Sequence, residues 1–169
     1  MSKLSVAIGK KKQDEKRLAI RNQVWGDEIE SLSLWEKEVY KGFASVPRTL
    51  PQLSRIMDKF SGKGFPVSTT YLSLLCNVFS HSFIEIKEKK RFAFESGFSG
   101  QRALTAWHGR MRKLESMGFI KSKLGMYDEF SYVLILDPFH AVEELYKDME
   151  KDELYYGLIS RMSDVGTVV

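Results

Sequence analysis

Apolar side chains recur every three or four residues along the first half of the chain, which is the pattern of amphipathic helices. Residues 27–43 show this spacing, and we expect their helix to end before Pro47. A second helix follows Thr49, whose hydroxyl can cap it. A third helix, over residues 68–79, starts at Ser68 as its N-cap and is apolar enough to lie at the centre of a fold. Three helices are therefore predicted before residue 81.

The central part of the chain alternates between extended and helical patterns. Residues 83–86 alternate apolar and polar side chains and predict a short strand. Residues 87–96 predict a short basic helix, and residues 101–117 predict a longer one for which Ser99 offers the N-cap. Beyond Gly118 the segments 119–124 and 130–136 predict a β-hairpin with a five-residue tip. The fold class that follows is mainly α with a small β-hairpin, an α+β fold.

The C-terminal residues return to helical spacing. Residues 139–163 predict a helix or broken helix whose apolar stripe is Phe139, Val142, Leu145, Tyr146, Met149, Tyr156, Ile159 and Met162. We expect this stripe to pack against its own domain, with a two-helix dimer interface as the alternative.

Residues 88–136 combine features that resemble the winged helix-turn-helix superfamily of DNA-binding proteins. Small side chains allow two helices to cross closely, and Gly97 can adopt the positive φ of a sharp turn, with Phe98 following it. These small residues are Ala93, Ala103 and Ala106. RMRKLESMGFI (110–120) is similar to the passage from a recognition helix into the first wing strand, and YVLILDP (132–138) to the returning strand. The resemblance implies a winged helix-turn-helix with extra N- and C-terminal helices.

The predicted organisation has four parts. They are a flexible basic arm (1–13), a winged-helix domain with N-terminal supporting helices (14–138), a C-terminal helix (139–163) and a tail (164–169). The arm is read as a solubilising segment, and contact with a DNA backbone or minor groove is the alternative.

The distribution of charge adds a functional clue that the small net charge of +4 conceals. Residues 1–21 carry a net charge of +5, residues 22–84 are neutral, residues 85–125 carry +6 and residues 126–169 carry −7. The central basic segment therefore coincides with the predicted helix-turn-helix, which favours a nucleic-acid partner over a generally solvated charged surface.

The longer central helix has two distinct faces. Its buried stripe is predicted to be Ala103, Trp107, Met111 and Leu114. On the opposite face, the candidates for reading base edges are Gln101, Arg102, Thr105 and His108. The candidates for contacting phosphates are Ser99, Arg110, Arg112, Lys113, Lys121, Lys123 and Tyr127.

The hairpin tip departs from the pattern of a basic wing. It reads GMYDE, and phosphates would repel Asp128 and Glu129. Two alternatives follow: the wing contacts DNA only through Lys121, Lys123 and Tyr127, or it faces a protein.

Catalytic signals are weak, so we expect a protein that is not an enzyme and needs no cofactor or metal. Cys76 lies in an apolar helix and is predicted to be a core thiol, and a single cysteine together with the absence of a signal peptide or membrane span favours the cytoplasm. The histidines lack metal-binding spacing. The three tryptophans, Trp25, Trp35 and Trp107, are expected to anchor the core.

The leading hypothesis is a sequence-specific binder of double-stranded DNA, acting as a transcriptional regulator, most simply a repressor. It would be cytoplasmic, associated with the nucleoid or a mobile element, and a homodimer through its C-terminal or N-terminal helices is an expected option. The alternatives are a plasmid or phage replication or partition factor, and a winged-helix domain that binds protein.

Overall fold

The computed structural model describes residues 3–35, 42–79, 81–127 and 129–167, with side chains from residue 11 onward. Within these ranges the chain is mainly helical with one small antiparallel sheet, so the predicted α+β class is confirmed. The chain divides into two compact units, Met1–Gly42 and Phe43–Val169. No helix in the described part of the chain is both long and apolar enough to cross a membrane.

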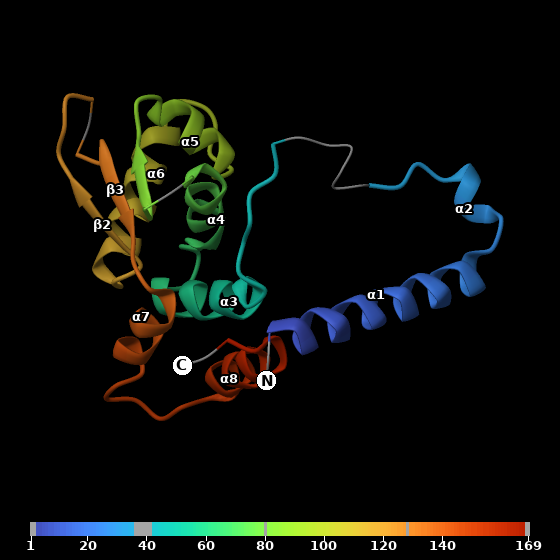
Figure 1. Cartoon of the computed structure of the whole chain (residues 1–169). Coiled ribbons are helices and arrows are strands. Elements are labelled where there is room, and N and C mark those ends of the chain that lie inside the picture. The colour runs from blue at the N-terminus through green and yellow to red at the C-terminus, as the bar shows by residue number, and fades with distance from the viewer. Residues whose placement is uncertain (1–2, 36–41, 80, 128, 168–169) are drawn as a thin grey trace. The chain divides into compact units, whose positions relative to one another are not determined.

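The first unit contains α1 (Lys3–Trp25) and α2 (Glu28–Ser31), and both differ from the sequence-based predictions (Figure 1). Residues 3–13 were expected in a flexible arm, but they form the start of α1, whose Lys, Arg, Gln, Glu and Ala content favours helix despite Gly9. The helix expected over 27–43 is reduced to α2; residues 32–35 are not helical, and residues 36–41 lie outside the described residues.

The apolar residues of this unit explain why the helix over residues 27–43 is so short. Trp25 and Trp35 are 50% and 69% exposed, so neither anchors a core as expected. An amphipathic helix gains most of its stability from packing its apolar face, and among residues 26–35 and 42 only Ile29 is half-buried. Periodicity alone therefore overestimated the length of this helix.

The second unit is built on α3 (Leu50–Ser61) and α4 (Ser68–Asn77), which pack together. Leu53, Ile56 and Met57 of α3 are fully buried, and they lie on one face of the helix. Ser68 is not the N-cap of α4. Instead, the Asp58 carboxylate of α3 accepts hydrogen bonds from the Val67 and Ser68 amides at 2.7 and 2.9 Å and from the Ser68 hydroxyl at 2.7 Å. A side chain from another helix thus satisfies the orphan donors of α4.

Helix α4 ends two residues earlier than predicted, and this changes the surroundings of its last turn. Phe79 lies beyond the helix and is 96% exposed. Cys76 is also exposed, so the expectation of a core thiol is wrong. The helix points Tyr71, Leu74 and Leu75 inward, and the side chain of Cys76 falls on its opposite face.

Three strands form one antiparallel sheet in the order β1-β3-β2, comprising β1 (Phe83–Glu85), β2 (Ile120–Lys123) and β3 (Tyr132–Ile135). The predicted hairpin is β2 and β3, and the predicted short strand joins it on the other side of β3. Figure 1 shows the sheet on one side of α4, α5 (Lys89–Glu95) and α6 (Ala103–Ser116). Ile84 and Val133 face these helices and are buried.

The C-terminal segment, predicted as a helix or broken helix over residues 139–163, is broken into two helices, α7 (Pro138–Leu145) and α8 (Glu153–Val165). Both pack against α3. The loop between them resets the helical phase, so Tyr155, Leu158 and Met162 are the buried residues of α8. Tyr156 and Ile159, which a continuous stripe would bury, are 60% and 40% exposed.

A polar brace fastens this segment to α3. Asp152 caps α8 and accepts hydrogen bonds from Lys59 at 2.6 Å and from the Tyr146 hydroxyl at 2.7 Å. The hydrogen bond from Lys59, and then that from Tyr146, hold the pKa of the Asp152 carboxyl well below its usual range. The rings of Phe60 and Tyr146 meet edge to face at 4.9 Å, which closes the core over the brace.

Candidate functional site

The turn between α5 and α6 has the backbone geometry that the sequence implies. Gly97 has φ +89°, and the Phe98 amide donates to the Ala93 carbonyl at 2.9 Å, which closes the end of α5. A second left-handed glycine, Gly100 at φ +77°, delays the start of α6 to Ala103. Ser99 is therefore not the N-cap, and no side chain caps this helix. Ser99 itself is exposed in the turn.

The body of α6 separates a buried face from an exposed one, as predicted. Trp107, Met111 and Leu114 have no exposed surface, and the ring of Trp107 meets Phe130 edge to face at 5.8 Å. Ala103 packs at the edge of the same core.

Three of the four base-reading candidates are exposed together at the start of the helix. They are Gln101, Arg102 and Thr105. Since Gln101 and Arg102 precede the first helical residue, they belong to the turn before α6, where the approach to a ligand is least hindered.

His108, the fourth candidate, is placed differently. Its ring is half-buried, with centroids 5.2 Å from Trp107 and 5.8 Å from Phe130. The interplanar angle to Phe130 is 29°, so the two rings stack. His108 lines the boundary between α6 and the hairpin, and does not share the open surface of Arg102 and Thr105.

Arg110, a phosphate candidate, is held within its own unit. Its Nε donates to the Pro66 carbonyl at 2.8 Å, and its guanidinium lies 3.5 Å from the centroid of Phe65 and 5.3 Å from that of Phe98. Partial burial lowers the pKa of this guanidinium. Arg110 fastens the loop before α4 to α6, which is a packing role.

Gly109 permits this approach of Phe65 to α6. A Cβ atom at that position would lie 3.2 Å from Phe65 Cζ, closer than most side-chain contacts. Because residue 109 has no side chain, the ring of Phe65 fits between the backbone of α6 and the guanidinium of Arg110.

Arg112 is paired with the hairpin tip. Its Nη2 forms a salt bridge with Glu129 Oε1, and its Nε lies 3.4 Å from Glu129 Oε2. Glu129 of the hairpin tip thus lies close to α6 and neutralises the positive charge of Arg112. The other acidic residue of the tip, Asp128, lies outside the described residues.

The remaining phosphate candidates lie on two separate elements. Lys113 is half-exposed in the last turn of α6. Lys121 and Lys123 project from the outer face of β2, and Lys121 is 3.8 Å from Glu115. Tyr127 is exposed at the hairpin tip, where its amide donates to Ser131 Oγ. Lys121, Lys123 and Tyr127 therefore belong to the hairpin, whereas Lys113 lies on the same helix as Thr105.

Two residues beside the start of α6 escaped the sequence reasoning. Lys90 and Phe94 of α5 line an open groove together with Phe98, Ser99, Gln101 and Leu104. Phe94 is 73% exposed, although its neighbours Phe92 and Ala93 are buried. Lys90 and Phe94 are four residues apart, which places both on the outer face of α5. This spacing is the feature of the sequence that could have identified them.

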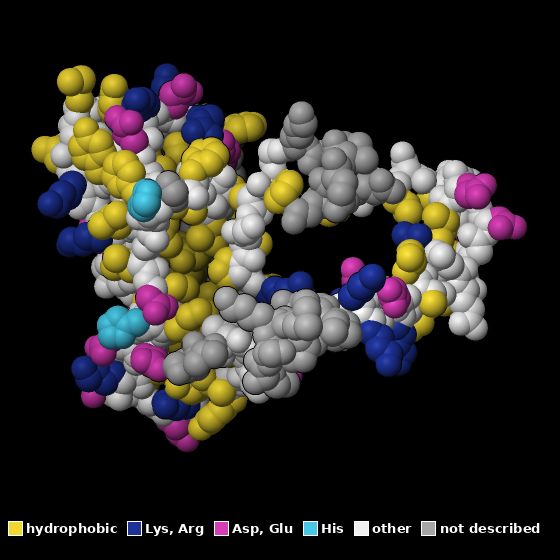
Figure 2. Space-filling view, in the orientation of Figure 1, with side chains coloured by type: hydrophobic (Ala, Val, Ile, Leu, Met, Phe, Trp, Pro, Cys, Tyr) yellow, Lys and Arg dark blue, Asp and Glu magenta, His cyan; other side chains and the backbone are white. Residues whose placement is uncertain are grey.

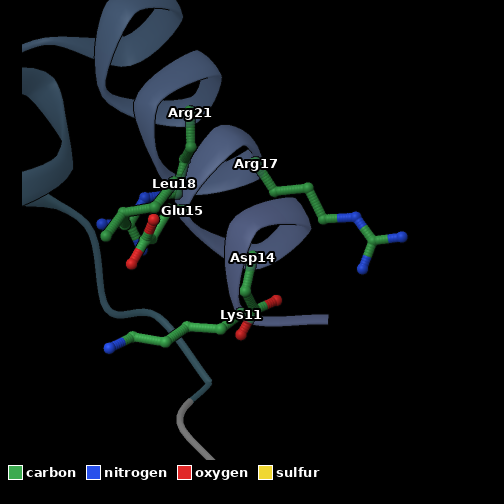
Figure 3. A pocket seen from close by; sticks show the side chains of 6 residues that line it. All are labelled: Lys11, Asp14, Glu15, Arg17, Leu18 and Arg21. Carbon is green, nitrogen blue, oxygen red and sulfur yellow. The ribbon is translucent and has the colours of Figure 1, made fainter. Parts of the chain in front are cut away.

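A second hollow lies on the first unit. Figure 3 shows that its lining side chains all come from α1, with acidic and basic groups along a single helix. No three acidic, cysteine or histidine side chains in the described part of the chain gather to hold a metal ion. The groove beside α6 is therefore the stronger candidate site.

Comparisons with known proteins provide no relative for this chain: no protein-family model, no curated protein and no solved structure matches it. The geometry of the site carries the functional argument alone.

Proposed function

We propose that the protein binds double-stranded DNA in a sequence-specific manner through α6, as a winged-helix transcriptional regulator. The order α4-β1-α5-α6-β2-β3 and the sheet order β1-β3-β2 support a winged-helix arrangement, because they provide the helix-turn-helix followed by the hairpin that the resemblance predicts. The buried faces of α5 and α6 support the close crossing that such a pair needs.

The observation that carries the proposal is the exposed polar cluster Gln101, Arg102 and Thr105 at the N-terminal end of a helix whose opposite face is fully buried. In a major groove, Gln can pair with adenine, Arg with guanine in a bidentate manner, and Thr with bases or phosphate. Residues near the start of a recognition helix contact base edges in helix-turn-helix proteins.

The interface that we propose is smaller than the sequence suggested, and it shifts toward α5. Lys90 and Ser99 line the groove beside the cluster, and Lys113 follows in the last turn of α6; all three are suited to phosphate contacts. Arg110 is left out because Phe65 and Pro66 engage its guanidinium. Repression would follow most simply from occlusion of the bound site.

Fluorescence anisotropy with random and host-derived duplexes across a salt series tests this function. Binding that weakens steeply with salt supports it, since each neutralised phosphate contributes a slope of roughly −0.9 in log affinity against log salt. Arg102→Ala combined with Thr105→Ala should weaken binding, whereas Lys63→Ala, an exposed change in the loop before α4, serves as the matched control. The absence of binding to any duplex at low salt rules the proposal out.

A protein-binding role is the second candidate, and the Arg112–Glu129 contact favours it. Glu129 at the hairpin tip lowers the positive electrostatic potential around α6. A less positive surface is suited to an uncharged or basic protein partner. If the protein has this role, Arg102→Ala and Thr105→Ala should leave its binding to the protein partner unchanged.

A plasmid or phage replication or partition factor would use the same surface of α6. Selection of bound sequences from random DNA separates these roles, since such factors act on repeated sites, while a dimeric repressor selects a palindrome.

A further inference from the structure

The outer face of the sheet is apolar where a solvated face should be polar. Phe83, Tyr132 and Leu134 point away from the helices and are 45%, 38% and 44% exposed. An antiparallel sheet with one face on a core normally alternates apolar residues inward with polar residues outward. Figure 2 shows hydrophobic side chains gathered over the strands, and the inward-facing Ile84 and Val133 already belong to the buried core.

The strand register orders this face into two rows. Phe83, Leu134 and Lys121 are paired across the three strands in one row. Glu85, Tyr132 and Lys123 form the other row. Each row therefore has an apolar centre on β3 and a lysine on β2. The first row ends in a phenylalanine on β1 and the second in a glutamate. The Phe83 and Tyr132 rings stack with centroids 6.2 Å apart, which joins the two rows into one surface.

We propose that this surface binds a second copy of the chain, face to face, about a two-fold axis parallel to β3. Such an axis places β1 of one copy over β2 of the other and lays the two β3 strands over each other. Because the operation preserves position along the strands, each row meets the same row of its partner.

The charges of the rows match this symmetry. Glu85 of one copy, which forms a salt bridge with Lys87 of its own chain at 3.1 Å, faces Lys123 of the other, twice in the dimer. Phe83 faces Lys121, whose ammonium can lie over the aromatic ring. Tyr132 and Leu134 meet their own equivalents at the centre. A two-fold axis across the strands would instead lay β2 over β2 and set lysines against lysines, so the charge pattern selects the first axis.

At the β2 edge of the sheet, one contact disfavours edge-to-edge association. The Ser122 amide and hydroxyl, at the outer edge of β2, donate to the Glu115 carboxylate at 2.8 and 2.9 Å. This contact occupies a backbone donor that another strand would need. Dimerisation through the sheet does not depend on the proposed function of α6, and it uses a surface different from the terminal helices that the sequence suggested.

Sedimentation equilibrium over a concentration series tests the dimer and its geometry. The wild-type chain should dimerise, and Glu85→Lys and Lys123→Glu should each weaken the dimer by roughly tenfold or more, since like charges then oppose each other at both contacts. Mixing the two variants should restore dimers, because the lysine introduced in one then faces the glutamate introduced in the other. An equimolar mixture that stays as monomeric as its components overturns the proposed axis.

Two further variants complete the test. Lys63→Glu makes the same charge change as Lys123→Glu, but away from the sheet, and should leave dimerisation unchanged. Ile159→Glu on α8 examines the competing interface: if this variant dissociates the dimer and the sheet variants do not, the sheet proposal is overturned. A wild-type chain that is monomeric at every concentration overturns it as well. Restored dimers in the mixture also show that both charge variants are folded.

Discussion

The outer face of α6 and the outer face of the sheet rest on the same core but have opposite character. At the start of α6, the exposed side chains are polar or cationic, and the apolar stripe turns wholly inward. On β3, apolar residues occupy both sides, so Val133 is buried while Tyr132 and Leu134 remain exposed. The difference identifies two kinds of surface. The first suits a charged, hydrated ligand, and the second suits another apolar protein surface.

The comparison also shows how each face limits its own partners. Glu129 neutralises Arg112 beside α6, which restrains non-specific attraction to phosphates. Lys121 and Lys123 flank the apolar residues of the sheet and discourage contact with a basic surface.

The largest effect on stability is expected from truncating a side chain of the core on which both faces rest. Trp107→Ala should lower the free energy of unfolding by about 3–5 kcal/mol, because the buried ring packs against Phe92 and Phe130. Urea denaturation measures this loss, and Trp35→Ala, which removes an exposed ring, should change stability by less than about 0.5 kcal/mol. Equal losses in the two variants would contradict the assignment of Trp107 as the shared support.

The next effect concerns pH and the brace at Asp152, which holds α7 and α8 to the core. Since the folded pKa of Asp152 is depressed, its contribution to stability is present above about pH 4 and is lost as pH falls further. Lys59 has a raised pKa, so its contribution is present below about pH 10 and is lost as pH rises beyond that.

Melting temperatures of the wild type and of Asp152→Asn measure the contribution of the brace. The gap between the two proteins should be constant from about pH 5 to 9 and should narrow in acid. Asp148→Asn, an exposed change in the same loop, is the control, and a gap that widens in acid would refute the assigned sign.

A smaller effect separates two arginines of the proposed DNA-binding domain. Arg110→Ala should cost about 1 kcal/mol of stability through loss of the Phe65 contact and the Pro66 hydrogen bond, while the salt dependence of DNA binding stays unchanged. Arg102→Ala should show the reverse behaviour. Thermal melts and anisotropy on both variants test this contrast, which fails if Arg110→Ala flattens the salt slope.

The smallest effect is expected at the hairpin tip. Glu129→Gln releases Arg112, so DNA binding should tighten by a few fold and the salt slope should steepen by roughly 0.9. Glu143→Gln removes the same charge from the exposed face of α7 and is the matched control. If neither variant alters binding, Arg112 does not take part in the interface.

Much of the central fold was predictable from local patterns. The buried residues of α3 and the inward stripe of α6 follow from helical spacing, and Gly97 takes the positive φ that a sharp turn requires. These features depend on side-chain periodicity and backbone sterics within a few residues. The exposure of Arg102 and Thr105 could be predicted for the same reason, because it is the complement of the buried stripe.

The failures share a different physical origin. In the described part of the segment 27–43, only Ile29 is half-buried, so little packing supports a longer helix. The phase of α8 depends on a loop whose length and geometry periodicity does not encode. The surroundings of Arg110 were equally beyond the reach of local patterns, because the Phe65 ring that engages its guanidinium comes from the loop before α4.

The sequence by itself determined the α+β class, the elements around the turn at Gly97, and the two faces of α6, since these depend on interactions between near neighbours. Only the tertiary structure decided that β1 joins the hairpin, that Asp58 and Asp152 cap helices while linking them to other parts of the domain, and that the outer sheet residues align as complementary rows. These features arise from contacts between residues far apart in the chain, whose geometry exists only once the core has brought them together.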